Sequence, residues 1–184
     1  SGHSPFKMPE SLKTVHFSNR IPEIMADYMT VAHYTDEAIG KFVEYLRTRP
    51  EYGRTMVVIT GDHEGLADNR KDLCRTKAGK GIVSENEFTP FIVLNSPIAM
   101  YHTKVMGQVD IYTTLLNLLG LESYRWSGIG QSILDSGKPG VAISPKRSIE
   151  GDTMFLSREE LLRMRQSQVI SDRIIRFDKL KDLR

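Results

Sequence analysis

Asp62 and His63 are the residues of this sequence whose types and placement point most directly to chemistry. They follow a short apolar run at residues 56–59, which is rich in β-branched side chains and predicts a strand buried on both faces. Gly61 permits a tight turn just before the pair. Because ligands of α/β sheets bind beyond the carboxyl ends of strands, a carboxylate and an imidazole placed there together suit a borderline divalent metal such as zinc or manganese.

A plain turn explains the same pair without any metal. In that interpretation Asp62 caps a helix and His63 is simply exposed. The local pattern leaves both interpretations open. The pair does not belong to a His-Glu-x-x-His zinc helix, because Ala67 stands where the second histidine would be.

Composition indicates the class of protein to which this chain belongs. The chain has 184 residues, of which 40% are hydrophobic and 26% charged, as in an ordinary globular domain with a sizeable core. Its formal net charge of +2 gives no reason to expect a nucleic-acid partner. No apolar run is long enough to span a bilayer. Cys74 is the single cysteine, so the chain forms no internal disulfide.

The elements that must position the pair follow from the pattern of apolar residues. Residues 1–22 predict irregular structure with His16 in a solvated loop, and residues 23–47 predict a helix that Pro50 prevents from continuing. His33 falls on this helix and is interpreted as a hydrogen-bonded packing residue. A long polar connection at 64–87 then leads to a second buried strand at 91–94.

The order of elements predicts an α/β layer with parallel strands. Asp110 is expected to cap a helix that ends at Gly120, and residues 141–144 add a short strand. Beyond Gly151, a Ser-x-x-Glu capping box at Ser157 opens a helix to about Met164. Residues 168–170 and 173–177 are expected to pair as a hairpin. We therefore assign residues 1–150, and a terminal helix and hairpin at residues 151–184, to one domain.

Five short motifs occur in a fixed order along the chain. They are SGHSPF at 1–6, VAHYTDEAIG at 31–40, ITGDHEG at 59–65, TPFI at 89–92 and GQVDIYTTLL at 107–116. Each motif alone is weak, but their succession resembles the sulfatase-type domain of the lipoteichoic acid synthase and phosphoglycerol transferase family. That family belongs to the alkaline phosphatase superfamily, and the resemblance covers residues 1 to about 135.

The resemblance implies a fold and a site. The fold would be α/β, with a mainly parallel sheet flanked by helices, and this chain would be the second half of the domain. Asp62 and His63 match the pair that binds a divalent metal, most often manganese, with zinc, magnesium or calcium as alternatives. His3 matches a histidine that faces the substrate's phosphate group and assists catalysis. The family's threonine nucleophile and first acidic ligand would precede residue 1, so this chain alone is expected to be inactive.

The implied function is metal-dependent phosphotransferase or phosphodiesterase chemistry on phosphoglycerol- or phosphoethanolamine-type head groups. The substrate would be an anionic, lipid-linked ester, and upstream helices would anchor a bacterial parent protein with this domain outside the cytoplasm. A sulfatase acting on sulfate esters is one alternative. Cys74 lacks the Cys-x-Pro-x-Arg context of a sulfatase, and His63 stands where sulfatases would have asparagine. A non-catalytic binding module is another. A homo-oligomer is expected to cover exposed sheet edges.

Overall fold

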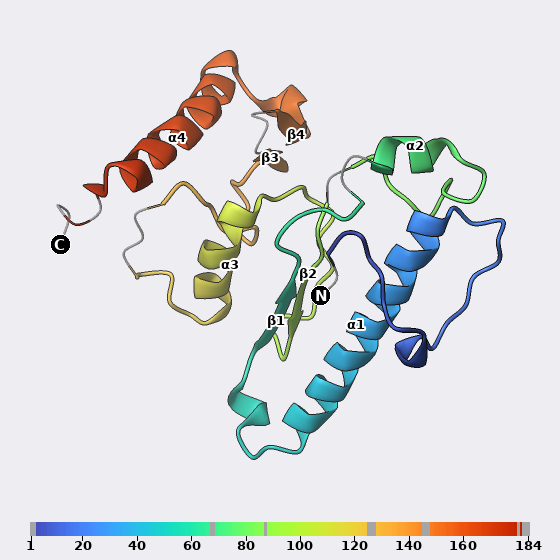
Figure 1. Cartoon of the computed structure of the whole chain (residues 1–184). Coiled ribbons are helices and arrows are strands. Elements are labelled where there is room, and N and C mark those ends of the chain that lie inside the picture. Colours follow the sequence, from blue (N-terminus) through green and yellow to red (C-terminus); the bar gives the residue numbers. More distant parts are fainter. Residues whose placement is uncertain are drawn as a thin grey trace. The chain divides into compact units, whose positions relative to one another are not determined.

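The structure is a computed structural model that describes residues 3–66, 69–86, 88–124, 128–144, 148–179 and 181. The chain forms two compact units, Ser1–Ser96 and Pro97–Arg184 (Figure 1). Within the described ranges, no helix is both long and apolar enough to cross a bilayer. The assignment of residues 1–150 and 151–184 to two parts of one domain stays a prediction.

The first unit is built from two helices and two strands. It contains α1 (Glu23–Arg47), β1 (Val57–Thr60), α2 (Arg70–Arg75) and β2 (Phe91–Leu94), with 3₁₀ turns at Glu10–Leu12 and Tyr52–Arg54 (Figure 1). The predicted helix over 23–47 and the predicted strand over 91–94 are confirmed to the residue. The first strand is shifted by one position from its prediction, and the long polar connection contains the short helix α2.

The strands β1 and β2 pair antiparallel, so the prediction of parallel strands is wrong for this pair. Thr60 lies opposite Phe91, and Val57 lies opposite Leu94. Parallel pairing needs a crossover that returns the chain to the other end of the sheet, usually through a long helix. Here the connection holds only the six-residue α2 in its described part and comes back to the end it left.

The burial of β1 also differs from its prediction. Val57 and Ile59 are half-buried, whereas Val58 and Thr60 are exposed. This alternation is the pattern of a strand covered on one face, as antiparallel sheets commonly are. The apolar run therefore packs on one side only, instead of being buried on both.

The core of the first unit joins four segments of the chain. Its buried members are Phe6, Met25, Val31, Leu66 and Leu73, from the N-terminal segment, α1, the loop after β1 and α2. Met25 is completely buried. Because these side chains share one cluster, the N-terminal segment and the loop after β1 are both held against the start of α1.

The second unit contains a short helix, a two-stranded sheet and a long terminal helix. Its elements are a 3₁₀ turn at Gln108–Asp110, α3 (Ile111–Leu118), β3 (Val141–Ile143), β4 (Ile149–Gly151), a 3₁₀ turn at Thr153–Phe155 and α4 (Arg158–Arg176). The strands β3 and β4 pair antiparallel. Gly120 adopts a left-handed φ of 69°, which agrees with its predicted place at the end of α3.

The predicted hairpin over 168–177 is wrong, because α4 runs through it without interruption. The helix begins where predicted, with the backbone N–H of Glu160 donating to Ser157 Oγ at 3.2 Å. It does not end near Met164. Asp172, expected in a turn, instead forms an ion pair with Arg176 one helical turn later, at 3.4 Å. Residues 171–172, which the predicted hairpin would place in its turn, are thus compatible with a helix interior.

Asp110 is the polar centre of the second unit. Its carboxylate lies 3.1 Å from the ammonium of Lys138, and both side chains are only 6% exposed. The same carboxylate accepts the backbone N–H groups of Gly107 at 2.8 Å and Gln131 at 2.9 Å. Asp110 occupies the position before α3, as predicted, but its side chain makes no capping hydrogen bond to that helix. It ties three segments together instead.

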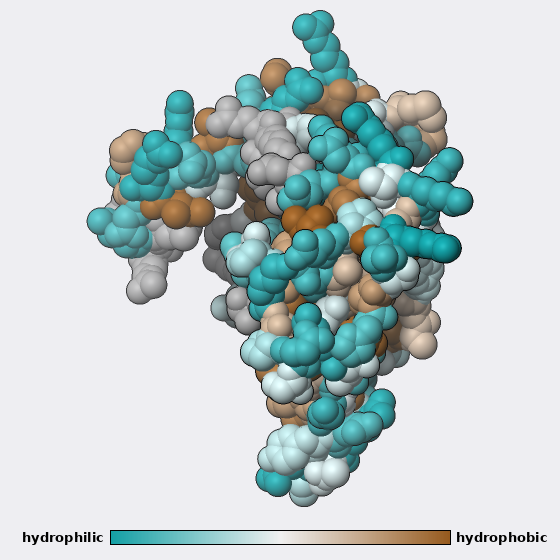
Figure 2. Space-filling view, turned by 45° about the vertical axis from the view of Figure 1, so that its right-hand side comes forward, coloured by the Kyte–Doolittle hydropathy of each residue, from teal (hydrophilic) through white to brown (hydrophobic). Residues whose placement is uncertain are grey.

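Apolar side chains remain on the surface of both units. Val58 and Ile92 are 36% and 47% exposed on the first sheet, and Ile170 and Phe177 are 54% and 63% exposed near the C-terminus. Figure 2 shows apolar residues scattered between hydrophilic ones over the face in view. The expected homo-oligomer stays a prediction.

Candidate functional site

The structure brings the three predicted site residues together. The rings of His3 and His63 lie with their centroids 6.1 Å apart and their planes at 82°. Nε2 of His63 is 3.8 Å from the carboxylate of Asp62. A histidine from the N-terminal segment therefore meets the Asp-His pair just beyond the carboxyl end of β1.

Phe6 anchors the segment that carries His3. Its backbone N–H donates to the carbonyl of His3 at 2.9 Å, and its backbone has a left-handed φ of 59°. Its side chain is buried in the core and meets the ring of Tyr28 edge to face, with centroids 5.2 Å apart. Since Tyr28 belongs to α1, this contact fixes the His3 segment against a rigid helix.

Lys7 makes a second attachment to the same helix. Its ammonium donates to the carboxylates of Asp27 and Glu23, each at 2.6 Å. The hydrogen bond to Asp27, followed by that to Glu23, raises the pKa of Lys7 above its ordinary value. The side chain is 58% exposed, so solvent screens the pair, and its main effect is to fix direction.

Gly65, which follows the His63 turn, lets the backbone pack closely against Tyr28. A Cβ atom at this position would collide with the phenol group of Tyr28, so only glycine permits the close approach. Leu66 follows with a left-handed φ of 61° and its side chain in the core. Tyr28 thus lies between Phe6 and Gly65 and connects the His3 segment with the His63 turn.

The sequence did not assign this connecting role. Tyr28 was only a residue within the helix predicted over 23–47, and Gly65 was only the last residue of the ITGDHEG motif. A glycine immediately after a polar turn was the available signal, because it often marks a close backbone approach. Its partner could not be predicted, since Tyr28 is distant in the sequence.

The geometry of His63 suits a metal ligand. Its Nδ1 lies 2.8 Å from the carbonyl oxygen of Glu64, and because a carbonyl can only accept, Nδ1 is the donor. The neutral ring then presents a lone pair at Nε2, the tautomer that metal-binding histidines use. The hydrogen bond to Glu64, followed by the charge of Asp62, raises the pKa of His63.

Asp62 completes a pair of oxygen and nitrogen donors. Its Oδ1 accepts the backbone N–H of His63 at 3.0 Å, and its side chain is 92% exposed. One carboxylate and one imidazole fit zinc or manganese and leave further coordination positions open. Over the described ranges, no group of three or more His, Cys, Asp or Glu side chains is arranged to hold a metal.

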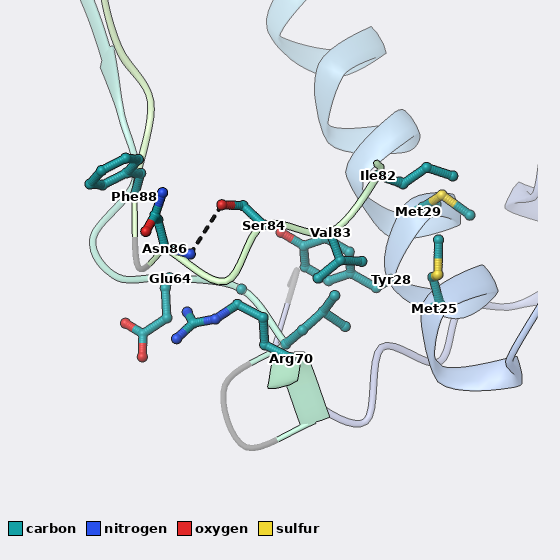
Figure 3. Close-up of a pocket in the computed structure, with 12 residues that line it drawn as sticks. Met25, Tyr28, Met29, Glu64, Arg70, Ile82, Val83, Ser84, Asn86 and Phe88 are labelled. Carbon is teal, nitrogen blue, oxygen red and sulfur yellow. Dashed lines mark hydrogen bonds between the residues drawn. The ribbon is translucent and has the colours of Figure 1, made fainter. Parts of the chain in front are cut away.

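A recess lies directly beside this turn (Figure 3). It has a volume of about 230 Å³, below the roughly 300–1,000 Å³ of sites for drug-sized ligands. The start of α1 forms one wall with Met25, Tyr28 and Met29, and Glu64 borders it next to His63. The guanidinium-bearing Arg70, only 6% exposed, also lines it. The site therefore has room for a small group next to the Asp-His pair.

The other two histidines discussed from the sequence have different surroundings. His33 Nδ1 lies 3.2 Å from the hydroxyl of Thr14, which agrees with its interpretation as a hydrogen-bonded residue of α1. His16 is 70% exposed and lies 3.8 Å from the carboxylate of Glu10. His16 is therefore a solvated residue, as predicted.

Comparison with known proteins identifies a family and several relatives of this chain. The Sulfatase family model matches residues 1–121, a range that includes His3, Asp62 and His63. Lipoteichoic acid synthases of Staphylococcus aureus strains USA300 and NCTC 8325 / PS 47 are each 25% identical to this chain over 143 residues. The match covers 74% of this chain but 22% of each relative, so the chain spans about a fifth of their length. This chain belongs to the sulfatase family, whose fold is of the α/β alkaline phosphatase type.

Proposed function

We propose that this chain supplies the Asp-His half of a divalent-metal site in a phosphotransferase or phosphodiesterase. The substrates would carry phosphoglycerol- or phosphoethanolamine-type head groups. The observation that carries the proposal is the convergence of His3 with Asp62 and His63, since it joins two separate motifs at one strand end. The similarity to lipoteichoic acid synthases supports phosphate chemistry in the complete protein.

Asp62 and Nε2 of His63 would hold the metal, with manganese first and zinc, magnesium or calcium as alternatives. When bound, the metal would neutralise charge on the transferring group and lower the pKa of a nucleophilic hydroxyl. The contact between His63 Nδ1 and the Glu64 carbonyl holds the ring in the orientation and tautomer that this role requires.

His3 would act on the phosphate group and on the leaving oxygen. Its Nδ1–H donates a hydrogen bond to the carbonyl oxygen of Ser4 at 3.3 Å, which directs Nε2 away from the backbone. In the imidazolium form, Nε2–H can donate a hydrogen bond to an anionic oxygen or a proton to a departing alkoxide. His3 is therefore proposed as the general acid and substrate-binding residue.

The remaining parts of the site are proposed to come from the longer protein. A threonine nucleophile and a further carboxylate ligand would be supplied by residues that precede this chain, and so would membrane anchoring with this domain outside the cytoplasm. Attack by the threonine would form a covalent ester that water or an acceptor alcohol then resolves. The recess beside His63 would accommodate the small alcohol part of the head group.

A sulfatase is the second candidate, because the matching family model carries that description. Sulfate and phosphate esters present similar anionic oxygens, so the described residues of the site would serve either. The histidine at position 63 favours phosphate, since sulfatases would have asparagine there. A non-catalytic module is the third candidate and requires that metal or anion binding persists without turnover.

The test uses the complete protein that contains this chain, supplied with Mn²⁺. Release of head group from phosphatidylglycerol and phosphatidylethanolamine is compared with hydrolysis of p-nitrophenyl sulfate. We expect phospholipid turnover that falls by roughly 10²–10⁴ in His3→Ala, as for loss of a general acid. The matched variant His16→Ala should retain native turnover. Cleavage of the sulfate ester alone would establish the sulfatase, and Mn²⁺ binding without turnover of either substrate would establish the binding module.

A further inference from the structure

The helix α4 presents a second surface that the proposed chemistry does not use. It lies beyond residue 121, where the family match ends, and none of its residues is buried. Leu162 and Ile170 are each 54% exposed and Phe177 is 63% exposed. At 3.6 residues per turn, spacings of eight and seven place these three side chains on one face of the helix, here called the outer face.

The opposite face of α4 is the one that packs on its own unit. The half-buried residues of the helix are Leu161, Met164, Ser167, Gln168, Val169, Ser171 and Ile174, and all of them except Val169 lie on this opposite face. The side-chain amide of Gln168 donates to the carbonyl of Ser144 at 3.3 Å. Most of this face packs on the protein's own residues, although Ile175 near its end is 71% exposed. The apolar residues of the outer face are left for a partner.

Charge on α4 indicates the kind of partner. Each acidic residue of the helix is engaged locally. Glu159 pairs with Arg163 at 2.7 Å, Glu160 accepts the hydroxyl of Ser157 at 2.7 Å, and Asp172 pairs with Arg176 at 3.4 Å. Arg158, Arg165 and Arg173 have no ion-pair partner among the described residues. With five arginines against three acidic residues, the helix has a net charge of +2.

These charges lie with the apolar residues and not apart from them. Helical spacing places Arg173 within the outer face, between Ile170 and Phe177, and Arg165 along its border. A helix that combines a row of apolar side chains with arginines, and that is too polar to enter a bilayer core, is typical of helices that lie in the membrane interface. The long arginine side chains can reach phosphate groups while the apolar residues insert.

We infer that the outer face of α4 binds the surface of an anionic lipid bilayer. The complementarity is between Arg165 and Arg173 and lipid phosphates, and between Leu162, Ile170 and Phe177 and the acyl boundary. The inference does not depend on the proposed function, because membrane binding needs neither a metal nor turnover.

The experiment measures partitioning of the 184-residue chain onto vesicles by co-sedimentation. One set of vesicles contains phosphatidylcholine alone, and the other contains phosphatidylcholine and phosphatidylglycerol in equal amounts. We expect binding to the anionic vesicles that weakens as salt is added. The double variant Arg165→Gln/Arg173→Gln should bind about tenfold to thirtyfold more weakly, since each basic side chain at an anionic surface contributes to binding.

Matched variants on α1 control for charge and hydrophobicity. Lys41→Gln/Arg47→Gln removes the same charge from exposed positions of another helix, and Phe42→Gln matches Phe177→Gln, since Phe42 is 55% exposed. Both controls should keep native partitioning, and Phe177→Gln should lose it. Circular dichroism verifies that every variant keeps its helices. The inference is wrong if the native chain ignores anionic vesicles or if the controls lose as much as the α4 variants. It is also wrong if sedimentation velocity without lipid shows a dimer that Phe177→Gln abolishes, because a second copy would then cover the face.

Discussion

Asp62 and Asp110 occupy comparable places in the two units, each in a turn that follows a glycine, yet their surroundings are opposite. The carboxylate of Asp110 is 6% exposed and is held by Lys138 and two backbone N–H groups. The carboxylate of Asp62 is 92% exposed and lies beside the imidazole of His63. Asp110 stabilises the fold of its unit, and Asp62 faces solvent where a ligand can reach it.

The contrast separates a structural carboxylate from a candidate ligand on physical grounds. Burying a charge is costly unless it is paired and hydrogen-bonded, and Asp110 meets that condition fully. An exposed carboxylate next to a histidine of fixed tautomer contributes little to stability but remains available to a cation. The following predictions test this division, beginning with the largest expected effect.

The largest effect is expected from Asp110→Ala. The substitution leaves the ammonium of Lys138 buried without its partner and removes the acceptor of the N–H groups of Gly107 and Gln131. We expect the free energy of unfolding to fall by about 3–5 kcal/mol, as when one partner of a buried ion pair is removed. Urea unfolding followed by circular dichroism measures the change.

A double variant isolates the part due to the buried charge. Asp110→Ala/Lys138→Met removes both charges, so it should recover a substantial part of the lost stability. If the double variant is as unstable as the single one, the ion pair is not what holds the second unit together.

The next effect is expected from Gly65→Ala in the first unit. The added Cβ collides with Tyr28, which must move together with Phe6 or force the turn away from α1. Overpacking of this kind costs about 1–3 kcal/mol. Urea unfolding measures the loss, and heteronuclear NMR of the His3 and His63 rings detects the change in their separation. Gly53→Ala is the control, because a Cβ there meets nothing within 4 Å. Equal effects of the two substitutions would refute the role of Gly65.

A smaller, pH-dependent effect is expected at the start of α4. The hydroxyl and backbone N–H of Ser157 lower the pKa of Glu160 from its ordinary value of 4.5. Because the folded pKa is the lower one, the stabilisation is present above pH 4.5 and disappears as the pH falls through the folded pKa. Helicity measured by circular dichroism should therefore decline on acidification.

Ser157→Ala should flatten this acid transition and weaken the helix by about 1 kcal/mol, since the N-cap hydroxyl is lost. Ser167→Ala is the comparison, because that hydroxyl bonds within the helix interior, to the carbonyl of Met164 at 2.7 Å. An unchanged acid transition in Ser157→Ala would show that Glu160 is not the group responsible.

The smallest effect on stability is expected from Asp62→Ala. The side chain is almost fully exposed, so the free energy of unfolding should change by less than about 0.5 kcal/mol. A loss of stability close to that of Asp110→Ala would end the distinction between the two aspartates. Urea unfolding of both variants under identical conditions makes the comparison direct.

Local patterns predicted the parts of the fold that depend on local physics. The apolar periodicity of α1, the strand at 91–94 and the capping box of Ser157 all appear where predicted, because each depends on neighbouring residues. The direction of β1 relative to β2 depends on how a long connection folds back, which no local pattern encodes. The apolar residues at 168–177 suit a strand or a helix equally, so the local pattern did not decide between them.

The sequence indicated candidate residues for the site but not the contacts that position them. The order of motifs indicated His3, Asp62 and His63, and the structure brings them together. The contact of Tyr28 with Phe6 and Gly65 could not be predicted, because it joins three segments that are distant in the sequence. The partners of Asp110 could not be predicted for the same reason, because Gln131 and Lys138 are distant from it in the sequence.

The most direct test of the proposed site is a titration of Mn²⁺ into the complete, chelator-treated protein by isothermal calorimetry. We expect one Mn²⁺ site whose affinity falls at least about a hundredfold in Asp62→Ala and in His63→Ala, more than for loss of an outer hydrogen-bond partner. His3→Ala and His16→Ala should bind Mn²⁺ as the native protein does. Native affinity in both Asp62→Ala and His63→Ala would contradict the assignment of these two residues to the metal.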